Sequence, residues 1–335
     1  MKRNLLAIIC LLALLVTGCA APQGPDSAPA AEPTAAAPPT AEPAPTIAPS
    51  LTTAPAPTTV PTAAPTHTPV PAEVAVISDV PYAEALDPDL GQQLLDIYYT
   101  PGMGENKPIV LWAHGSSLDK STGRIMGRIL AKEGYVVIPF TWLTAEPGEA
   151  VEKVRAATEY AECVLRFAAA EAGQYGADPQ RVIWTGFSAG SWLGAILALS
   201  EDGSVQEEWD SYAAANDGPP QQVRCAAAAE PAAITALVAG AGSYADEFWL
   251  DGNEVPSLKE WHAPLKSLAA IGHNPELVVR LLHGKSDHSP FTDFDDAERF
   301  AAALAEAGYD VTFLPQNGAH ESFQTEIIEQ VKALP

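Results

Sequence analysis

The chain has 335 residues and a formal net charge of −24, from 18 lysine and arginine residues against 42 aspartate and glutamate residues. An acidic surface of this kind repels the phosphate backbone, so we expect no nucleic acid among its partners. Only four cysteines are present and no histidines cluster beside them, so the sequence predicts no zinc site.

The N-terminus has the pattern of a lipoprotein signal peptide over residues 1–19. Lys2 and Arg3 precede a short apolar run, and Val16-Thr-Gly-Cys19 matches the lipid-attachment motif. The apolar run is too short for an ordinary transmembrane helix. We therefore expect a lipid on Cys19 that anchors the protein to a membrane, at the cell surface or in the periplasm. The alternative is a plain secretory signal in which Cys19 is incidental.

Residues 20–72 are dominated by proline, alanine and threonine and contain no aromatic side chain. This composition buries too little apolar surface to fold, which predicts a disordered, extended tether. From about Glu73 the composition becomes globular, and residues 73–335 suit one large α/β domain.

Strand and helix patterns alternate along this domain. The expected strands are 94–99, 108–113, 135–139, 181–185, 223–229, 277–282 and 310–314. The expected helices are 121–133, 148–172, 191–199, 293–307 and 322–333. The alternation predicts a doubly wound, mostly parallel sheet with its site at the carboxyl ends of the strands. The rhythm weakens within 200–273, where aromatic residues fit either a small cap over the site or an insertion anchored to the core.

The pattern Gly186-x-Ser188-x-Gly190 stands between an expected strand and an expected helix. A serine at such a sharp turn has a strained backbone, and side chains two residues away on either side would collide. Glycine at both places lets the hydroxyl of Ser188 stand clear of the sheet, as a nucleophile requires. The N–H of Ala189 then faces the space where an oxyanion would form.

An acid and a base follow Ser188 in the chain. Asp287 comes after a buried strand and a glycine turn, and Glu230 is an alternative acid at the end of the preceding expected strand. His320 lies on the loop after the last strand, which completes the order serine, acid, histidine. The N–H of Ser116, after the strand 108–113, is the expected second oxyanion donor.

Cys163 and Cys225 are the cysteines left in the exported chain. They either form a disulfide, as an oxidising compartment permits, or remain two buried thiols.

Residues 74–335 resemble an α/β-hydrolase of the esterase/lipase group, near the alkyl- and feruloyl-esterase-like or dienelactone-hydrolase-like branches. The matching pieces are Leu95-Asp-Ile-Tyr98, Ala113-His-Gly-Ser116, Gly186-Phe-Ser-Ala-Gly190, His283-Gly-Lys-Ser-Asp287 and Gly318-Ala-His320. Many relatives carry His-Gly-Gly-Gly in the oxyanion loop, where this chain has His114-Gly-Ser-Ser117.

The resemblance implies cleavage of carboxylic esters through an acyl-enzyme, with Ser188, Asp287 and His320 as the triad. It implies no metal or organic cofactor. Small-molecule or polysaccharide-linked esters met outside the cell are the expected substrates. Two alternatives stay open: a serine peptidase of the same fold, and a non-catalytic surface binding protein that kept the fold.

Overall fold

The computed structural model describes residues 73–86, 92–142, 151–199, 210, 214, 221–244, 274, 276–289 and 292–335. The predicted leader and tether lie outside these residues, as does most of the range expected to hold a cap. Contacts divide the chain into a unit of Met1–Thr66 and a second unit of His67–Pro335. Every described strand and helix belongs to the second unit, which therefore contains a complete sheet and core of its own.

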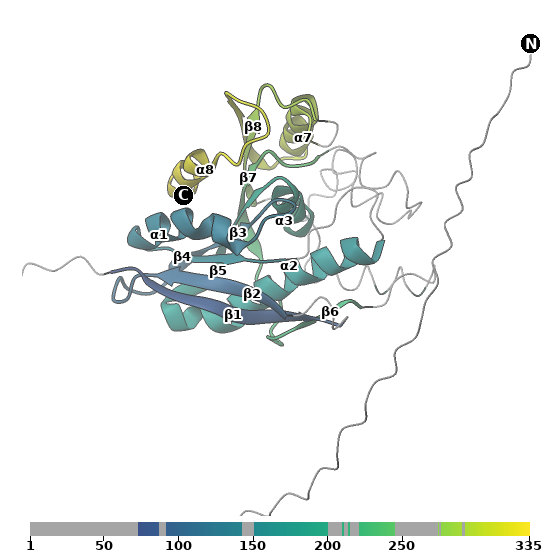
Figure 1. The fold of residues 1–335 in the computed structure, drawn as a ribbon. Coiled ribbons are helices and arrows are strands. Elements are labelled where there is room, and N and C mark those ends of the chain that lie inside the picture. Colours follow the sequence, from purple (N-terminus) through teal and green to yellow (C-terminus); the bar gives the residue numbers. More distant parts are fainter. Residues whose placement is uncertain are drawn as a thin grey trace, which may run out of the picture. The chain divides into compact units, whose positions relative to one another are not determined.

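The described residues form a nine-stranded sheet in the order β6-β1-β2-β4-β3-β5-β7-β8-β9 (Figure 1). Its strands are β1 (Ala75–Ala85), β2 (Gln92–Tyr99), β3 (Lys107–Ala113), β4 (Val136–Phe140), β5 (Ala177–Phe187), β6 (Val223–Cys225), β7 (Ile234–Gly240), β8 (Val278–Gly284) and β9 (Asp310–Gln316). From β4 across to β9 all neighbours are parallel, while β6, β1 and β2 add an antiparallel edge. The carboxyl ends of the parallel strands therefore share one edge of the sheet.

Helices cover both faces of this sheet (Figure 1). They are α1 (Arg124–Lys132), α2 (Val151–Glu171), α3 (Ala189–Leu199), α7 (Phe294–Glu306) and α8 (Gln324–Lys332), with short 3₁₀ turns η2 (Lys120–Gly123) and η3 (Ala172–Tyr175). Along β3, Ile109 and Leu111 pack with α2, α3 and α7, whereas Val110 and Trp112 pack with α1 and α8. Within the described ranges, no helix combines the length and apolar character needed to span a bilayer.

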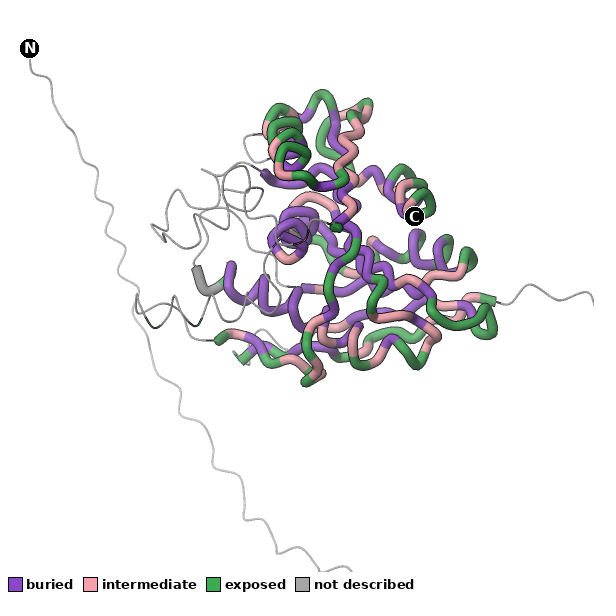
Figure 2. Tube along the Cα trace, turned by 180° about the vertical axis from the view of Figure 1, so that it is seen from behind, coloured by how far each residue is buried: buried purple, intermediate pink, exposed green. Residues whose placement is uncertain are grey.

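The central strands are buried on both faces, as Figure 2 shows for the sheet and for α3. Their continuous apolar sequences follow from this, because a parallel strand covered by helices has no solvent face. The predicted strands over 94–99, 108–113, 135–139, 181–185, 277–282 and 310–314 all have counterparts in the sheet.

The strand expected over 223–229 is wrong in length and in pairing. β6 has three residues and pairs antiparallel with β1, with Ala83 opposite Cys225. The parallel strand that follows α3 in the chain is instead β7. The four alanines from Ala226 to Ala229 have weak strand propensity, whereas Ile234 and Val238 give β7 the β-branched residues that a buried strand favours.

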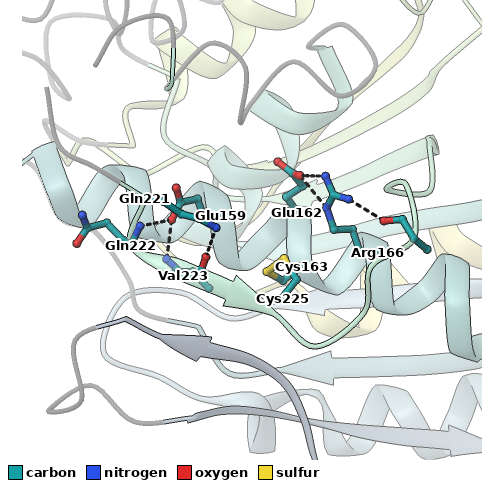
Figure 3. The surroundings of a disulfide bond; sticks show 9 residues. Glu159, Glu162, Cys163, Arg166, Gln221, Gln222, Val223 and Cys225 are labelled. Carbon is teal, nitrogen blue, oxygen red and sulfur yellow. Dashed lines mark hydrogen bonds and ion pairs between the residues drawn. A yellow bond between two sulfur atoms is a disulfide. The ribbon is translucent and has the colours of Figure 1, made fainter. Parts of the chain in front are cut away.

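A disulfide joins Cys163 on α2 to Cys225 on β6, with a Cα–Cα distance of 4.9 Å (Figure 3). It decides between the two states that the sequence left open for these cysteines. One oxygen of Glu159 accepts the backbone N–H groups of Gln222 and Val223, both at 2.8 Å. The short edge strand β6 is thus attached to α2 by a covalent bond and by hydrogen bonds.

A cavity of about 300 Å³ lies beside this disulfide, lined in part by Glu162 and Arg166. Arg166 donates to the Glu162 carboxylate and to the backbone oxygen of Ala229 at 2.7 Å. Ser188, Asp287 and His320 do not line this cavity, so it belongs to a different part of the domain.

Candidate active site

Ser188 occupies the turn between β5 and α3, at the carboxyl edge of the parallel strands. Its φ of 54° places a non-glycine residue in the left-handed region, where L side chains are strained. The strain is held by the surroundings, since the Ser188 N–H donates to Gly240 O at 3.0 Å. The Ser188 carbonyl accepts the N–H of Ser191 at 3.0 Å. The turn thus presents the hydroxyl above the sheet.

Both glycines of the turn are required by close backbone contacts. A Cβ on Gly186 would lie 2.6 Å from the carbonyl of Gly190, and one on Gly190 would lie 2.2 Å from the oxygen of Ala113. Neither contact can be relieved by rotating a side chain, because the atoms met are backbone. The steric reason expected for the Gly-x-Ser-x-Gly pattern therefore applies to this chain.

His320 connects Ser188 to Asp287. Its Nε2 lies 3.0 Å from Ser188 Oγ, and its Nδ1 lies 2.9 Å from Asp287 Oδ2. Asp287 is 2% exposed, whereas the His320 side chain is 35% exposed. A buried carboxylate on one ring nitrogen and a serine hydroxyl on the other is the arrangement in which imidazole takes the serine proton. The structure brings together the three residues that the sequence singled out.

The loops that carry the acid and the base are tied to each other by backbone contacts. Ser286 N–H donates to Gly318 O at 3.0 Å and Lys285 N–H donates to Gln316 O at 2.9 Å. The loops pass so closely that a Cβ on Gly284 would lie 2.1 Å from the oxygen of Ala319. Asp287 and His320 therefore lie on two loops that are hydrogen-bonded to each other, although 33 positions separate them.

Thr292 is a member of the site that the sequence did not reveal. Its Oγ1 donates to Asp287 Oδ2 at 3.0 Å and lies 3.0 Å from His320 Nδ1. The hydroxyl thus contacts both groups of the acid–base pair. Other contacts hold Asp287 as well, since the N–H of Ser289 donates to Oδ1 at 3.2 Å. No spacing rule pointed to Thr292, since it lies in the irregular segment before α7.

His283 is hydrogen-bonded to the backbone of Thr292. Its Nε2 donates to the Thr292 carbonyl at 2.7 Å and lies 3.3 Å from Asp287 Oδ2. Because a carbonyl only accepts, the proton of the neutral ring is on Nε2. Burial lowers the pKa of His283 below its usual value, so the ring is neutral near pH 7.

The predicted oxyanion donors flank Ser188. Ala189 opens α3, and the first N–H groups of a helix have no partner within the helix. On the other side, Gly115 packs so closely that a Cβ placed on it would lie 3.2 Å from the Cβ of Ser188. The Gly115 carbonyl accepts from His114 Nδ1 at 2.8 Å and from Leu118 N–H at 3.2 Å.

In a planar trans peptide the carbonyl and the N–H point in opposite directions. The Ser116 N–H therefore points away from His114 Nδ1 and the Leu118 N–H, which donate to the Gly115 carbonyl. His114 fixes this peptide as a neutral ring. Its Nε2 accepts a hydrogen bond from the backbone N–H of Trp142 at 3.3 Å, which assigns the proton of the ring to Nδ1. Burial is the main cause that lowers the pKa of His114. Two ring nitrogens with opposite roles thus hold the loop on which Ser116 lies.

Residues 95–288 match the family model BD-FAE, which is more than half of the chain. The chain belongs to the BD-FAE family. The match covers the turn with Ser188 and ends one residue after Asp287, so His320 lies beyond it. No curated protein matches the chain.

Solved structures show the fold of this BD-FAE protein. Esterase Est2 from the planctomycete Thermogutta terrifontis is 18% identical with a TM-score of 0.54, over 78% of this chain and 91% of that one. A bacterial heroin esterase is 17% identical with a TM-score of 0.53, over 78% and 82% of the two chains. A form of the same Thermogutta enzyme phosphonylated by cyclosarin is 16% identical with a TM-score of 0.52, over 78% and 92%. These likenesses confirm the α/β-hydrolase fold.

Glu230 does not serve as the acid in this arrangement. It was expected at the carboxyl end of a parallel strand, but it is exposed and precedes β7 in the loop after β6. That position is at the amino edge of the parallel strands, whereas Ser188 stands at the carboxyl edge. The alternative was wrong because the strand before it was misplaced.

The described part of this BD-FAE protein contains no group of three or more histidine, cysteine, aspartate or glutamate side chains placed to hold a metal ion.

Proposed function

We propose that this protein is a serine carboxylesterase, in which Ser188, His320 and Asp287 form the catalytic triad. The observation that carries the proposal is the continuous chain of hydrogen bonds from Ser188 Oγ through His320 to the buried Asp287, at 3.0 and 2.9 Å. The BD-FAE family match and the likeness to structures titled as esterases support it.

The first half of the reaction forms an acyl-enzyme. His320 Nε2 accepts the Ser188 proton as Oγ attacks the ester carbonyl, and the resulting imidazolium is stabilised by Asp287. The carbonyl oxygen becomes an anion that accepts hydrogen bonds from the N–H groups of Ala189 and Ser116. Losing one such donor typically costs about 3 kcal/mol of transition-state stabilisation. The intermediate then collapses and expels the alcohol, which receives its proton from His320.

The second half repeats these steps with water. His320 takes a proton from water as the water oxygen attacks the acyl carbon. The tetrahedral intermediate collapses, and Ser188 Oγ leaves with the proton returned by His320. The products are the free acid and the regenerated serine. Thr292 keeps Asp287 and the Nδ1 side of His320 aligned through both halves.

We also propose that the enzyme acts outside the cytoplasm, anchored through lipid on Cys19, on small or polysaccharide-linked esters. The disulfide between Cys163 and Cys225 supports export, because such bonds persist in oxidising compartments. The short apolar leader and the proline-rich segment after it support the anchor and the tether. The test is mass spectrometry of the membrane fraction, where a diacylglyceryl group on Cys19 is expected and an unmodified Cys19 would contradict the anchor.

The activity is tested by hydrolysis of p-nitrophenyl acetate and butyrate with the full chain and its Ser188→Ala variant. The matched control is Ser286→Ala, which removes an exposed hydroxyl from the acid loop and keeps the backbone bond to Gly318. We expect the control to keep its activity and Ser188→Ala to lose it. We also expect a fluorophosphonate probe to label the parent and the control only.

Three outcomes would overturn the proposal. Activity that survives in Ser188→Ala would assign the chemistry to another nucleophile. A folded parent that cleaves amides faster than esters would identify a peptidase, and one that neither cleaves nor takes up the probe would identify a binding protein. Acetylated and feruloylated polysaccharides then test the substrate class, since no release of acetate or ferulate would exclude the polysaccharide version.

A further inference from the structure

The outer side of α1 carries only basic and aliphatic residues. The exposed positions of this helix are Arg124, Ile125, Arg128, Ile129 and Lys132, here called the cationic face. Ile125 is 66% exposed and Ile129 is 38% exposed, which places them among the most exposed large apolar side chains of the described residues. Two branched aliphatic side chains in solvent, on one side of a helix and between cations, need a physical reason.

The charge of the cationic face is opposite to that of the whole chain. The formal net charge is −24, yet α1 contributes three cations and no anion. Among the described residues, no carboxylate forms an ion pair with Arg124, Arg128 or Lys132. The nearest acid along the chain, Glu133, lies 3.7 Å from Lys332 of α8. The cationic face is therefore available to an anionic partner that the acidic remainder of the domain would repel.

The chain enters the domain on the same side of the sheet. Val74 and Val76, the first apolar residues of the folded unit, pack against the cluster that contains Leu130 and Ala131 of α1 and Val331 of α8. Figure 1 shows α1 beside α8 on this side. Everything before Val74 belongs to the segment that leads back to the predicted lipid on Cys19. The first described residues of the domain, which follow the predicted anchor and tether, thus pack on the same face of the sheet as α1.

We propose that the cationic face is a docking surface for an anionic lipid bilayer. Arg124, Arg128 and Lys132 bind the negative headgroups, and Ile125 and Ile129 enter the boundary between headgroups and acyl chains. The exposed isoleucines favour a bilayer over an acidic polysaccharide, because a glycan offers no apolar layer in which to bury them. The proposal stands independently of ester hydrolysis, since it concerns a surface that contains no residue of the triad.

Docking would also orient the candidate active site. The loop between β3 and η2 carries Ser116 and Leu118, and Leu118 is 45% exposed and precedes α1 by six positions. This loop leads through η2 directly into α1, so Leu118 would extend the apolar contact towards the segment that carries Ser116. The domain would then meet esters at the membrane surface.

The test is co-sedimentation of residues 67–335, the unit with its own complete sheet, with vesicles of phosphatidylglycerol and phosphatidylcholine. This unit lacks Cys19, so any binding comes from the domain itself. Arg124→Glu/Arg128→Glu is compared with Arg224→Glu/Arg299→Glu, which changes the net charge equally at exposed positions of β6 and α7. Ile125→Ser/Ile129→Ser tests the apolar part.

We expect the parent to bind the anionic vesicles and not pure phosphatidylcholine, with binding weakened by salt. Each cation near an anionic surface contributes a factor of about five, so the α1 charge reversal should lower binding by about 25-fold or more. The isoleucine variant should also bind more weakly, and the control should bind within about threefold of the parent.

An equal loss in both charge variants would show only a net-charge effect and would overturn the proposal. So would a parent that ignores anionic vesicles, or one that binds polygalacturonate while leaving the vesicles unbound. Circular dichroism spectra of all variants exclude unfolding as the cause of a loss. Hydrolysis of p-nitrophenyl acetate by the same samples shows separately whether the candidate active site works.

Discussion

Replacing Thr292 by valine should lower the turnover of the proposed esterase without changing its affinity for substrate. Valine keeps the shape and the branch at Cβ but removes the hydroxyl that contacts Asp287 Oδ2 and His320 Nδ1, both at 3.0 Å. The backbone carbonyl of Thr292 still accepts from His283. The loop should therefore stay in place while the acid and base lose one shared partner.

The magnitude follows from the charge of these partners. A hydrogen bond to a charged group contributes about 1.5–3 kcal/mol. Its loss is felt most when His320 becomes an imidazolium, a state that forms during the reaction. A barrier raised by about 1.5–3 kcal/mol lowers kcat about 13- to 160-fold. Thr292 is 5% exposed, so it has no direct contact with substrate and KM should stay unchanged.

The assay is steady-state hydrolysis of p-nitrophenyl acetate by the parent, Thr292→Val and Thr292→Ser. Serine restores the hydroxyl, so we expect it to recover most of the parent kcat while valine does not. Melting temperatures of the three proteins separate a local loss from unfolding. The Thr292 hydroxyl has no such role if valine leaves kcat within twofold of the parent, or if serine is as impaired as valine in a folded protein.

Further outcomes can be measured on the same protein. Gly190→Ala should abolish esterase activity, because the new Cβ would lie 2.2 Å from a backbone oxygen. The control Gly173→Ala should keep its activity, because its new Cβ would meet nothing within 4 Å. Equal activity of the two variants would contradict this steric argument. Cys163→Ala/Cys225→Ala should lower the free energy of unfolding by about 4 kcal/mol, because the disulfide restricts an unfolded loop with a sequence separation of 62. A denaturant titration measures this, and an unchanged midpoint would contradict the prediction. Burial lowers the pKa of His114 in the folded protein, so the unfolded chain takes up this proton at a higher pH than the folded protein does. The free energy of unfolding should therefore fall as pH drops below about 6.5. His114→Gln should flatten the melting temperature profile between about pH 7 and 5, and an equal slope would oppose the assignment.

The positions of the proposed triad could be predicted from the sequence because each one follows a strong local signal. Gly186 and Gly190 frame Ser188, and the structure shows that backbone contacts at both places leave no room for a side chain. Asp287 and His320 each follow a continuous apolar strand, and the shared edge of a parallel sheet brings such positions together. The order of the three along the chain then selected them among other acids and histidines.

What the sequence could not give depends on contacts between distant segments. Thr292 lies in an irregular loop, and only the folded structure brings its hydroxyl within 3.0 Å of both Asp287 Oδ2 and His320 Nδ1. β1 was missed because its pairing is irregular near Asp79 and Pro81, which interrupts the alternation expected of a strand. The pairing of Cys163 with Cys225 required the unexpected antiparallel position of β6.

The disulfide links the stability of the domain to the compartment in which it works. The bond closes the segment from Cys163 to Cys225, which contains β5, the turn with Ser188 and α3. Domains have net stabilities of only about 5–15 kcal/mol, so a contribution near 4 kcal/mol is a large share. In a reducing cytoplasm the bond would not form, and the domain that carries the turn with Ser188 would have a lower free energy of unfolding. The chain would therefore reach its full stability only in an oxidising compartment, such as the one in which we propose that it meets its esters and the bilayer surface.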